Sequence, residues 1–365
     1  MSAAPVILGT MTFGRSSQVK PAEAQVQLEA LVRFVDALAR LQGTSASPIV
    51  DTARIYQGGE TEEVLGDILA ASPALKSRIV IHTKAHPMVC ALDAKGVRAQ
   101  LTASLKALRC DKVAVFYLHS PDLRVPLVDT LRECDKLHRE GLFDELGMSN
   151  YAAWDVAYAH FLCQREGFAV RPRVYQGVYS ALNRSLEPEL LPCCRTFGMR
   201  VVVYNPLAAG LLTGRYSTKE DVASATSGRF SAEFDIMPAT APAGSPLKGV
   251  AHKMYRERYS SEHIFAAIAG IRASLEGGQV PMAEAALRWA MHHSRLAPRL
   301  GDAVVFGASS AAQCQANLDA CLKGTLPPGV VKAFDAAVVV AGPGEPYLRG
   351  YDAKPGCADA YLAKF

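Results

Sequence analysis

Eight short apolar runs alternate with stretches of helical periodicity along this chain. The runs are rich in β-branched and aromatic residues, and they are too short to be helices. Continuous apolarity, in place of an in-and-out alternation, is typical of parallel strands that are covered on both faces. We therefore predict eight parallel strands, at residues 6–9, 48–51, 79–84, 113–119, 145–150, 174–178, 200–204 and 303–307.

The intervals between the runs have the period of an amphipathic helix. Apolar side chains recur at helical spacing within residues 97–108 and again within residues 127–137. Asp93 and Pro126 stand where the N-terminal signals of these helices are expected. Eight strand–helix units close a (β/α)₈ TIM barrel, so this α/β fold is favoured over an open doubly wound sheet. The first run is not followed by GxGxxG, which also argues against a dinucleotide-binding sheet.

The interval between the seventh and eighth runs breaks the rhythm because it spans roughly a hundred residues. Within it, residues 217–249 are dense in Ser, Thr, Ala, Pro and Gly, which predicts a long loop over the barrel mouth. Residues 342–365 are also irregular and predict a C-terminal tail. We predict one (β/α)₈-barrel domain over residues 1–365, with these two segments as loop insertion and tail.

Charge and composition exclude several classes of function. The formal net charge is +4 and the Lys and Arg residues are scattered, so no basic face for nucleic acid or a membrane surface is expected. No apolar stretch is long enough to cross a bilayer, and the N-terminus lacks an export signal. The nine cysteines lack metal-site spacing, so we expect a cytoplasmic protein with reduced thiols and no bound metal.

Polar residues at the carboxyl ends of barrel strands are where an active site is expected. Asp51 ends the second run, and Tyr56 follows it in the next loop. Lys84 ends the third run and His119 the fourth. Each alone has an ordinary alternative, such as capping a turn, packing in a loop or carrying a solvated charge. Their coincidence at three successive strand ends indicates one catalytic site.

Together the four side chains make chemical sense for carbonyl reduction. A tyrosine is a poor proton donor at neutral pH, but a nearby ammonium lowers its pKa. We expect Lys84 to act on Tyr56 in this way, with Asp51 holding Lys84 in place. His119 would orient a bound carbonyl oxygen. Since no nucleophile or metal cluster accompanies the set, a cofactor hydride is the expected attacking group.

This pattern resembles the aldo-keto reductases, whose tetrad has the same four residue types in the same order. The resemblance extends from Ile7 to about Arg349. Residues 151–154 and 287–289 are most similar to the branch of aflatoxin-aldehyde and succinic-semialdehyde reductases. The matching segments are 51–56, 83–84, 118–119, 149–151, 175–176, 204–208, 210–216, 228–230 and 302–310.

The resemblance implies NADPH-dependent reduction of a small-molecule carbonyl: an aldehyde, a ketone or a quinone. It places the substrate beside Tyr56 and His119, with Met11 and Arg229 as further contacts. It assigns the nicotinamide to Ser149, Asn150, Gln176 and Tyr204, and the adenosine 2′-phosphate to the start of the last barrel helix. The implied cofactor contacts are Ser149, Asn150, Gln176, Tyr204, Asn205, Pro206, Leu207, Gly210, Leu212, Arg215, Ser309, Ser310, Gln313 and Asn317.

Two of these assignments have alternatives. Ser310 and Gln313 also have the spacing of a capping box, and a helix N-terminus is itself an anion site. Arg229 fits a substrate carboxylate, but it could equally pair with an acid in its own loop. The chain departs from the branch in an insertion of about fifteen residues between Phe230 and Met254 and in its extended C-terminus. Both regions border the substrate pocket in this family, so the substrate itself is not predicted.

Three classes of function remain at this point. The leading hypothesis is an NADPH-dependent carbonyl reductase, compatible with a homodimer. A nucleotide-binding regulatory subunit, like the potassium-channel β-subunits that resemble these reductases, would carry the same tetrad. A metal-dependent barrel hydrolase is disfavoured, because it needs several His and carboxylate ligands and only Asp51 and His119 stand at strand ends.

Overall fold

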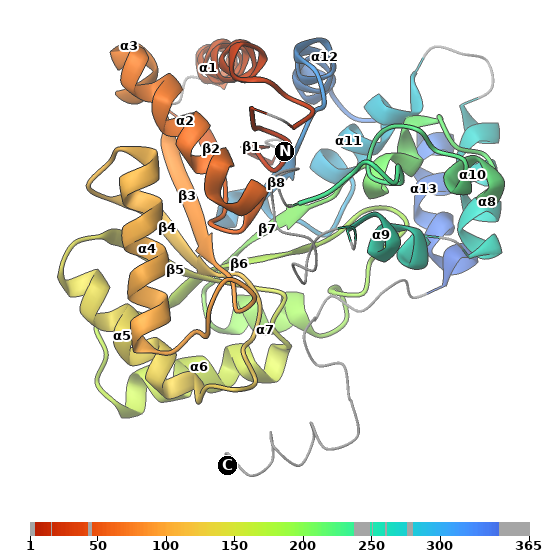
Figure 1. The fold of residues 1–365 in the computed structure, drawn as a ribbon. Helices are drawn as coiled ribbons and strands as arrows, with labels where there is room; N and C mark the ends of the chain where they lie inside the picture. The colour runs from red at the N-terminus through yellow and green to blue at the C-terminus, as the bar shows by residue number, and fades with distance from the viewer. Residues whose placement is uncertain are drawn as a thin grey trace.

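Eight parallel strands form a closed barrel in the order β1 to β8 in this computed structural model (Figure 1). The structure describes residues 4–15, 17–42, 46–236, 249, 251–259, 261–275 and 280–342. The predicted TIM barrel and all eight predicted strands are confirmed, with ends that differ by at most two residues. The strands are β1 (Val6–Gly9), β2 (Ile49–Asp51), β3 (Val80–Ala85), β4 (Val113–Leu118), β5 (Phe143–Ser149), β6 (Pro172–Val178), β7 (Arg200–Tyr204) and β8 (Ala303–Phe306).

The barrel closes where β1 pairs with its neighbours on both sides. Ile7 is in register with Ile49 of β2 and with Val305 of β8. Inward-facing apolar side chains from five of the strands form a separate buried cluster, as expected for a barrel whose interior is packed. The cluster consists of Ile7, Val115, Tyr117, Val174, Val202, Ala303 and Val305.

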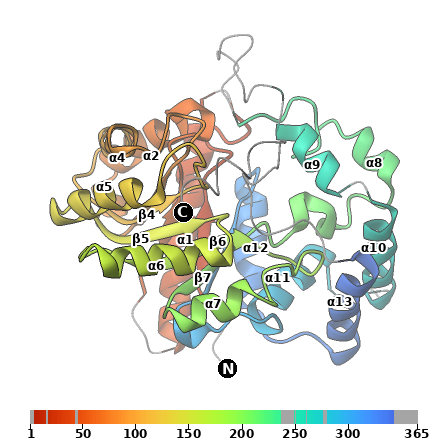
Figure 2. The same ribbon diagram turned by 90° about the horizontal axis from the view of Figure 1, so that it is seen from below.

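Helices surround the strands, as the view from below shows (Figure 2). The predicted cap of one of them is confirmed, because Asp93 Oδ1 accepts a hydrogen bond from Gly96 N at 2.8 Å. The helices are α1 (Pro21–Gln42), α2 (Glu60–Ala71), α3 (Pro73–Lys76), α4 (Ala94–Leu108), α5 (Leu127–Arg139), α6 (Ala153–Arg165), α7 (Leu190–Thr196), α8 (Lys219–Ala223), α9 (Ala251–Tyr259), α10 (Glu262–Ser274), α11 (Met282–His292), α12 (Ala311–Leu322) and α13 (Pro328–Ala341).

The long interval between β7 and β8 is more helical than its composition predicts. It contains α8 to α11, of which α8 lies inside the predicted loop 217–249. Thr218 caps α8 in a reciprocal box with Asp221, which explains how a short helix forms in this polar stretch. Residues 237–248 of the loop and 343–365 of the predicted tail lie outside the described residues. Helices α8, α9, α10 and α13 lie together on one side of the barrel (Figure 1).

No helix in the described part of the chain is both long enough and apolar enough to cross a membrane.

Candidate active site

The four predicted catalytic side chains come together at the carboxyl ends of β2, β3 and β4. Lys84 Nζ donates hydrogen bonds to Asp51 Oδ1 and to the carbonyl oxygen of Thr52, the latter at 2.7 Å. The same Nζ lies 5.6 Å from the ring centroid of Tyr56. The ring of His119 meets that of Tyr56 edge to face, with centroids 5.8 Å apart. Strand ends far apart in sequence thus form a single constellation.

The Lys84–Asp51 ion pair is almost completely buried. The side chain of Lys84 has no exposed surface and that of Asp51 only 4%. Asp51 Oδ2 accepts a further hydrogen bond from Gln176 Nε2 at 2.8 Å, so both carboxylate oxygens are bound. Burial lowers the pKa of Lys84, and the charge of Asp51 opposes that shift. The pair is therefore two opposite charges that neutralise each other next to Tyr56.

The lowering of the Tyr56 pKa that was expected from Lys84 is not seen. The pKa of Tyr56 is raised well above 10, mainly by burial and next by the negative charge of Asp51. The physical reason is that burial disfavours a phenolate, and the negative charge of Asp51 disfavours it further. As a consequence, Tyr56 keeps its phenol proton at neutral pH, which a proton donor requires.

A buried acid that the sequence analysis missed supports the segment carrying Tyr56. Glu62 accepts hydrogen bonds from Arg54 Nη1 at 2.8 Å, from Ser104 Oγ at 3.0 Å and from the hydroxyl of Thr83. The backbone N–H of Arg54 donates to the carbonyl oxygen of Lys84 at 3.1 Å. The network thus ties the loop after β2 to β3, on either side of the catalytic lysine. The only sequence signal was an acid in the first turn of α2, a common place for one.

His86 is a second residue that the sequence analysis missed. It follows β3 directly, and its ring meets that of His119 at a centroid distance of 4.8 Å and an interplanar angle of 84°. Gln100 on α4 holds its backbone by accepting a hydrogen bond from His86 N at 2.9 Å. The ring of His119 thus makes one edge-to-face contact with Tyr56 and another with His86.

The residues predicted to hold a nicotinamide lie beside this constellation. Asn150 Nδ2 donates to Ser149 Oγ at 3.0 Å and to the carbonyl oxygen of His119 at 2.9 Å. Its Oδ1 accepts a hydrogen bond from the hydroxyl of Tyr204 at 2.8 Å. Asn150 has a positive φ of 64°, which asparagine tolerates better than most residues. Gln176 donates a hydrogen bond to Asp51 and so connects these predicted nicotinamide contacts to the tetrad.

The loop after β7 is held in a strained conformation. Asn205, Ala208 and Ala209 all have positive φ, as does Gly210 at 104°. Two alanines in this region are unusual, and such strain persists only where surrounding contacts determine it. Here the side chain of Asn205 makes these contacts. Its Oδ1 accepts a hydrogen bond from Ala209 N at 2.7 Å, and its Nδ2 donates one to the hydroxyl of Tyr259 at 2.7 Å. A strained loop at a strand end is typical of a ligand-binding segment.

Other predicted cofactor contacts in this loop differ in exposure. Pro206 is buried and Leu207 half-buried, whereas the side chain of Leu212 lies fully in the core. Arg215 is exposed and donates to Ser227 Oγ at 2.6 Å. Of these side chains, Arg215 alone offers an accessible charge.

The start of α12 differs from the predicted capping box. Ser310 Oγ accepts from Gln313 N at 3.2 Å, so the forward half of the box is confirmed. The side chain of Gln313 does not return to Ser310; its Oε1 accepts from the backbone N–H and the hydroxyl of Ser309, at 3.1 and 2.6 Å. Asn317, two turns from the cap, is buried. Ser309 and Gln313 are exposed. The hydroxyls of Ser309 and Ser310 both lie at the N-terminus of α12.

An acid from α1 also reaches this helix end. Glu23 Oε1 accepts a hydrogen bond from Ala311 N at 2.8 Å. A carboxylate at a helix N-terminus is stabilised by the helix dipole. The predicted site for the adenosine 2′-phosphate therefore already has a negative charge at its edge.

Arg229 and Met11, the predicted substrate contacts, are in contact with each other. Arg229 Nη1 lies 3.8 Å from Met11 Sδ. No acid among the described residues lies within ion-pair distance of Arg229, so its pairing with a loop acid is not seen there. The charge of Arg229 acts on Tyr56 against the rise in its pKa that burial and Asp51 cause. Its guanidinium is therefore near the reaction centre.

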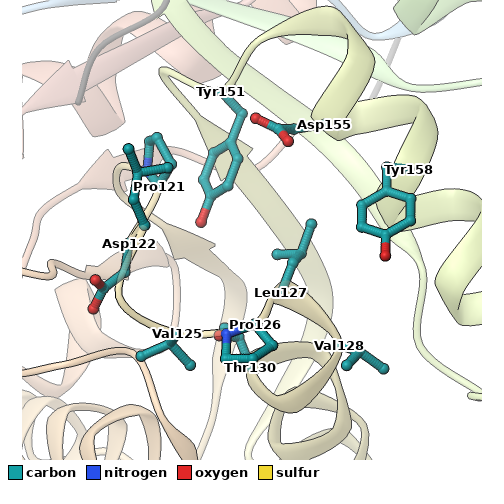
Figure 3. Close-up of a pocket in the computed structure, with 11 residues that line it drawn as sticks. Pro121, Asp122, Val125, Pro126, Leu127, Val128, Thr130, Tyr151, Asp155 and Tyr158 are labelled. Atoms are coloured by element: carbon teal, nitrogen blue, oxygen red, sulfur yellow. The ribbon is translucent and has the colours of Figure 1, made fainter. Parts of the chain in front are cut away.

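A separate hollow opens beside the loop after β4 and the exposed side of α6 (Figure 3). It is lined by mostly apolar residues of the 121–130 stretch and by Tyr151, Asp155 and Tyr158, of which the last two lie on α6. The ring of Tyr151 lies within it, and its carbonyl oxygen accepts a hydrogen bond from the hydroxyl of Tyr175 at 2.7 Å. None of the predicted site residues lines this hollow, so it is distinct from the tetrad.

Comparison with known proteins gives the same family over nearly the whole chain. The family model described as the aldo/keto reductase family matches residues 5–339. Aflatoxin B1 aldehyde reductase member 2 of Rattus norvegicus is 40% identical over 346 residues, which cover 92% of this chain and 86% of the relative. Aflatoxin B1 aldehyde reductase member 4 of Homo sapiens is 44% identical over 293 residues, covering 79% and 83%. Aldo-keto reductase pigE of Monascus ruber is 34% identical over 337 residues, covering 91% and 93%.

Proposed function

The chain belongs to the aldo/keto reductase family, and from this premise we propose that it reduces aldehydes to alcohols with NADPH as the electron donor. Ketones and quinones are secondary substrate classes of the same chemistry. The similar mammalian relatives are named as aldehyde reductases, which supports an aldehyde as the principal substrate class.

The observation that carries this proposal is the convergence of a protonated tyrosine with a buried ion pair and a histidine. Tyr56 retains its proton at neutral pH, and Lys84 Nζ lies 5.6 Å from its ring. Such a set can protonate a carbonyl oxygen, and it contains no group that could attack the carbon. Among the described residues, no group of three His, Cys, Asp or Glu side chains could hold a metal ion.

Each of the four residues has a role in this proposal. Tyr56 donates its phenol proton to the carbonyl oxygen. Lys84 stabilises the phenolate that remains, because its ammonium lies 5.6 Å from the centroid of the Tyr56 ring. Asp51 keeps Lys84 charged and in place through the buried ion pair. His119, whose ring contacts those of both Tyr56 and His86, orients the carbonyl.

The side chains beside the tetrad fit a nicotinamide. A carboxamide has both donors and acceptors, as do the side chains of Ser149, Asn150 and Gln176. The hydroxyl of Tyr204 is fixed by Asn150, so its half-buried ring has a set orientation against which a flat ring could stack. When bound, the nicotinamide nucleotide supplies the hydride. The strained loop from Asn205 to Arg215 would lie along the diphosphate.

The α12 N-terminus is proposed to bind the 2′-phosphate of NADPH. The hydroxyls of Ser309 and Ser310 and the helix dipole favour an anion there. Gln313 and Asn317 would lie beside the adenosine. Glu23 opposes a phosphate at this end, so the preference for NADPH over NADH depends on the balance between these groups.

We propose that Arg229, with Met11 beside it, binds a carboxylate on the substrate. The guanidinium is half-buried, close to Tyr56 and without an acidic partner among the described residues. A partly desolvated guanidinium is a favourable site for a carboxylate, which it can bind with two parallel hydrogen bonds. An aldehyde with a carboxylate at its other end, such as succinic semialdehyde, therefore fits this site.

The test is NADPH oxidation with a panel of aldehydes that includes succinic semialdehyde, with NADH assayed in parallel. The proposal expects turnover of several aldehydes and a higher kcat/KM with NADPH. Absence of turnover over the whole panel, with intact NADPH binding, would contradict it and favour a nucleotide-binding regulatory subunit.

A further inference from the structure

The guanidinium of Arg229 lies against two neighbouring aromatic rings. Its Cζ lies 5.1 Å from the ring centroid of Phe234 and 5.3 Å from that of Tyr255. Both distances are within the range of cation–π contacts, which strengthen where water is excluded. Phe234 is buried and Tyr255 half-buried. The two rings meet at 72°, with centroids 5.9 Å apart.

Both rings lie on the same side of the guanidinium, because their centroids are only 5.9 Å apart. The five N–H donors of arginine lie in the plane of the group, and no acid among the described residues lies within ion-pair distance of them. In this structure Nη1 lies against Met11 Sδ, a weak acceptor, at 3.8 Å. The in-plane donors of Arg229 therefore remain available for a carboxylate, while the rings restrict its orientation.

The segment that carries Phe234 is fastened directly to the catalytic loop. Gln57, the residue after Tyr56, donates from its backbone N to the carbonyl oxygen of Ile236 at 2.7 Å. Its side-chain Nε2 donates to the carbonyl oxygen of Asp235 at 3.0 Å. Gln57 adopts a positive φ of 48° while making these bonds. These two hydrogen bonds fix the spacing between the segment that carries Phe234 and the proton donor, Tyr56.

The second ring comes from α9, which is anchored to the same segment. Arg256 Nε donates to the carbonyl oxygen of Phe230 at 2.8 Å. The buried rings of Phe230 and Tyr259 meet at 90°, with centroids 6.3 Å apart. Phe234 and Tyr255 thus come from two segments whose positions relative to each other are fixed by a hydrogen bond and a ring contact.

We propose that Phe234 and Tyr255 are positioning residues that hold Arg229 ready for the carboxylate of an aldehyde substrate, and that these two rings determine the preference for anionic over neutral aldehydes. This inference rests on the proposed function. The inference goes beyond the proposed function because it assigns substrate specificity to two aromatic residues that do not themselves bind the carboxylate. Because a planar guanidinium can bind a carboxylate through two parallel N–H donors, lysine at position 229 would not replace arginine.

The experiment compares Tyr255→Leu with Tyr255→Phe on two four-carbon aldehydes, succinic semialdehyde and butanal. Tyr255→Leu removes the ring and should raise the KM for succinic semialdehyde about tenfold, with kcat and the KM for butanal within about twofold of the wild type. Tyr255→Phe keeps the ring and should keep the wild-type KM. The inhibition constant of succinate, which binds without turnover, should rise in parallel in Tyr255→Leu.

A second variant guards against a folding defect. Phe234→Leu should give the same split between the two aldehydes, and thermal unfolding reports whether either variant is folded. An equal rise in KM for both aldehydes, or no rise for succinic semialdehyde in folded variants, would overturn the proposal. Failure of the proposed function is distinguishable, because the wild type would then reduce neither aldehyde.

Discussion

Lys84 and Asp51 form an ion pair in which neither side chain is appreciably exposed. The pair lies next to the ring of Tyr56, which we assign as the proton donor. Two buried charges of opposite sign are costly to separate, because each loses its solvation and then its partner. The pair fixes the position of the ammonium next to Tyr56 without lowering the pKa of that phenol. Stability and catalysis are therefore coupled at this point of the barrel.

Replacing Lys84 should reveal this coupling. Lys84→Met leaves the carboxylate of Asp51 buried with only Gln176 as a side-chain partner, which should lower the free energy of unfolding by about 3–5 kcal/mol. Urea denaturation measures the loss. Lys112→Met breaks the exposed pair with Asp144 and should have a far smaller effect. Equal losses in the two variants would refute the special cost of the buried pair.

His82 should make the fold sensitive to acid. It is buried on β3, and burial, followed by the charges of Arg200 and Lys84, lowers its pKa to about 3. Since the unfolded chain takes up this proton near pH 6.5 and the folded chain only near pH 3, stability is lost as pH falls between these values. The slope from this group is about 1.4 kcal/mol per pH unit. His82→Leu should reduce the slope in denaturation curves from pH 7 to pH 4, and an unchanged slope would contradict the assignment.

Gly59 should be intolerant of any side chain. A Cβ there would lie 1.6 Å from an Arg54 guanidinium nitrogen, and the φ of 103° is unfavourable for other residues. Gly59→Ala should therefore displace Arg54 from Glu62 and lower both stability and kcat. Gly141→Ala is the matched control, because Gly141 also has a positive φ but nothing within 4 Å of its Cβ. If both variants lose the same stability and activity, the Arg54–Glu62 pair does not support the Tyr56 loop.

Glu23 should reduce the preference for NADPH. Glu23→Gln keeps an oxygen that can accept from Ala311 N but removes the negative charge next to the proposed phosphate site. The ratio of kcat/KM for NADPH to that for NADH should rise about threefold, as expected for one charge screened by water. Glu29→Gln, which removes the same charge farther along α1, should leave the ratio unchanged. A ratio that does not differ between the two variants would argue against the phosphate assignment.

The barrel and the tetrad could be predicted because both follow from local signals. A parallel strand covered on both faces must be apolar throughout, so a run such as 113–119 is visible without any tertiary information. Strand order then places Asp51, Lys84 and His119 at one rim. The helices between β7 and β8 were harder to predict, because α8 depends on a single capping box in a stretch whose composition favours a loop.

Features decided by contacts between distant segments could not be predicted in this way. Glu23 reaches a backbone N–H of α12 that is 288 positions away, and helical spacing gives no sign of this. Gln313 has two acceptable partners one residue apart, and the structure uses Ser309. The direction of the Tyr56 pKa shift depends first on burial and next on the charge of Asp51, and the order of residues shows neither the burial nor the distance between the two groups.

The central claim is that Tyr56 is the proton donor, and Tyr56→Phe tests it most directly. The variant keeps the ring and its contact with His119 but has no phenol proton. Single-turnover and steady-state reduction of a small aldehyde should slow about a thousandfold, while NADPH binding, followed by fluorescence titration, stays within about twofold of the wild type. Retention of more than about a tenth of the wild-type kcat would contradict this account.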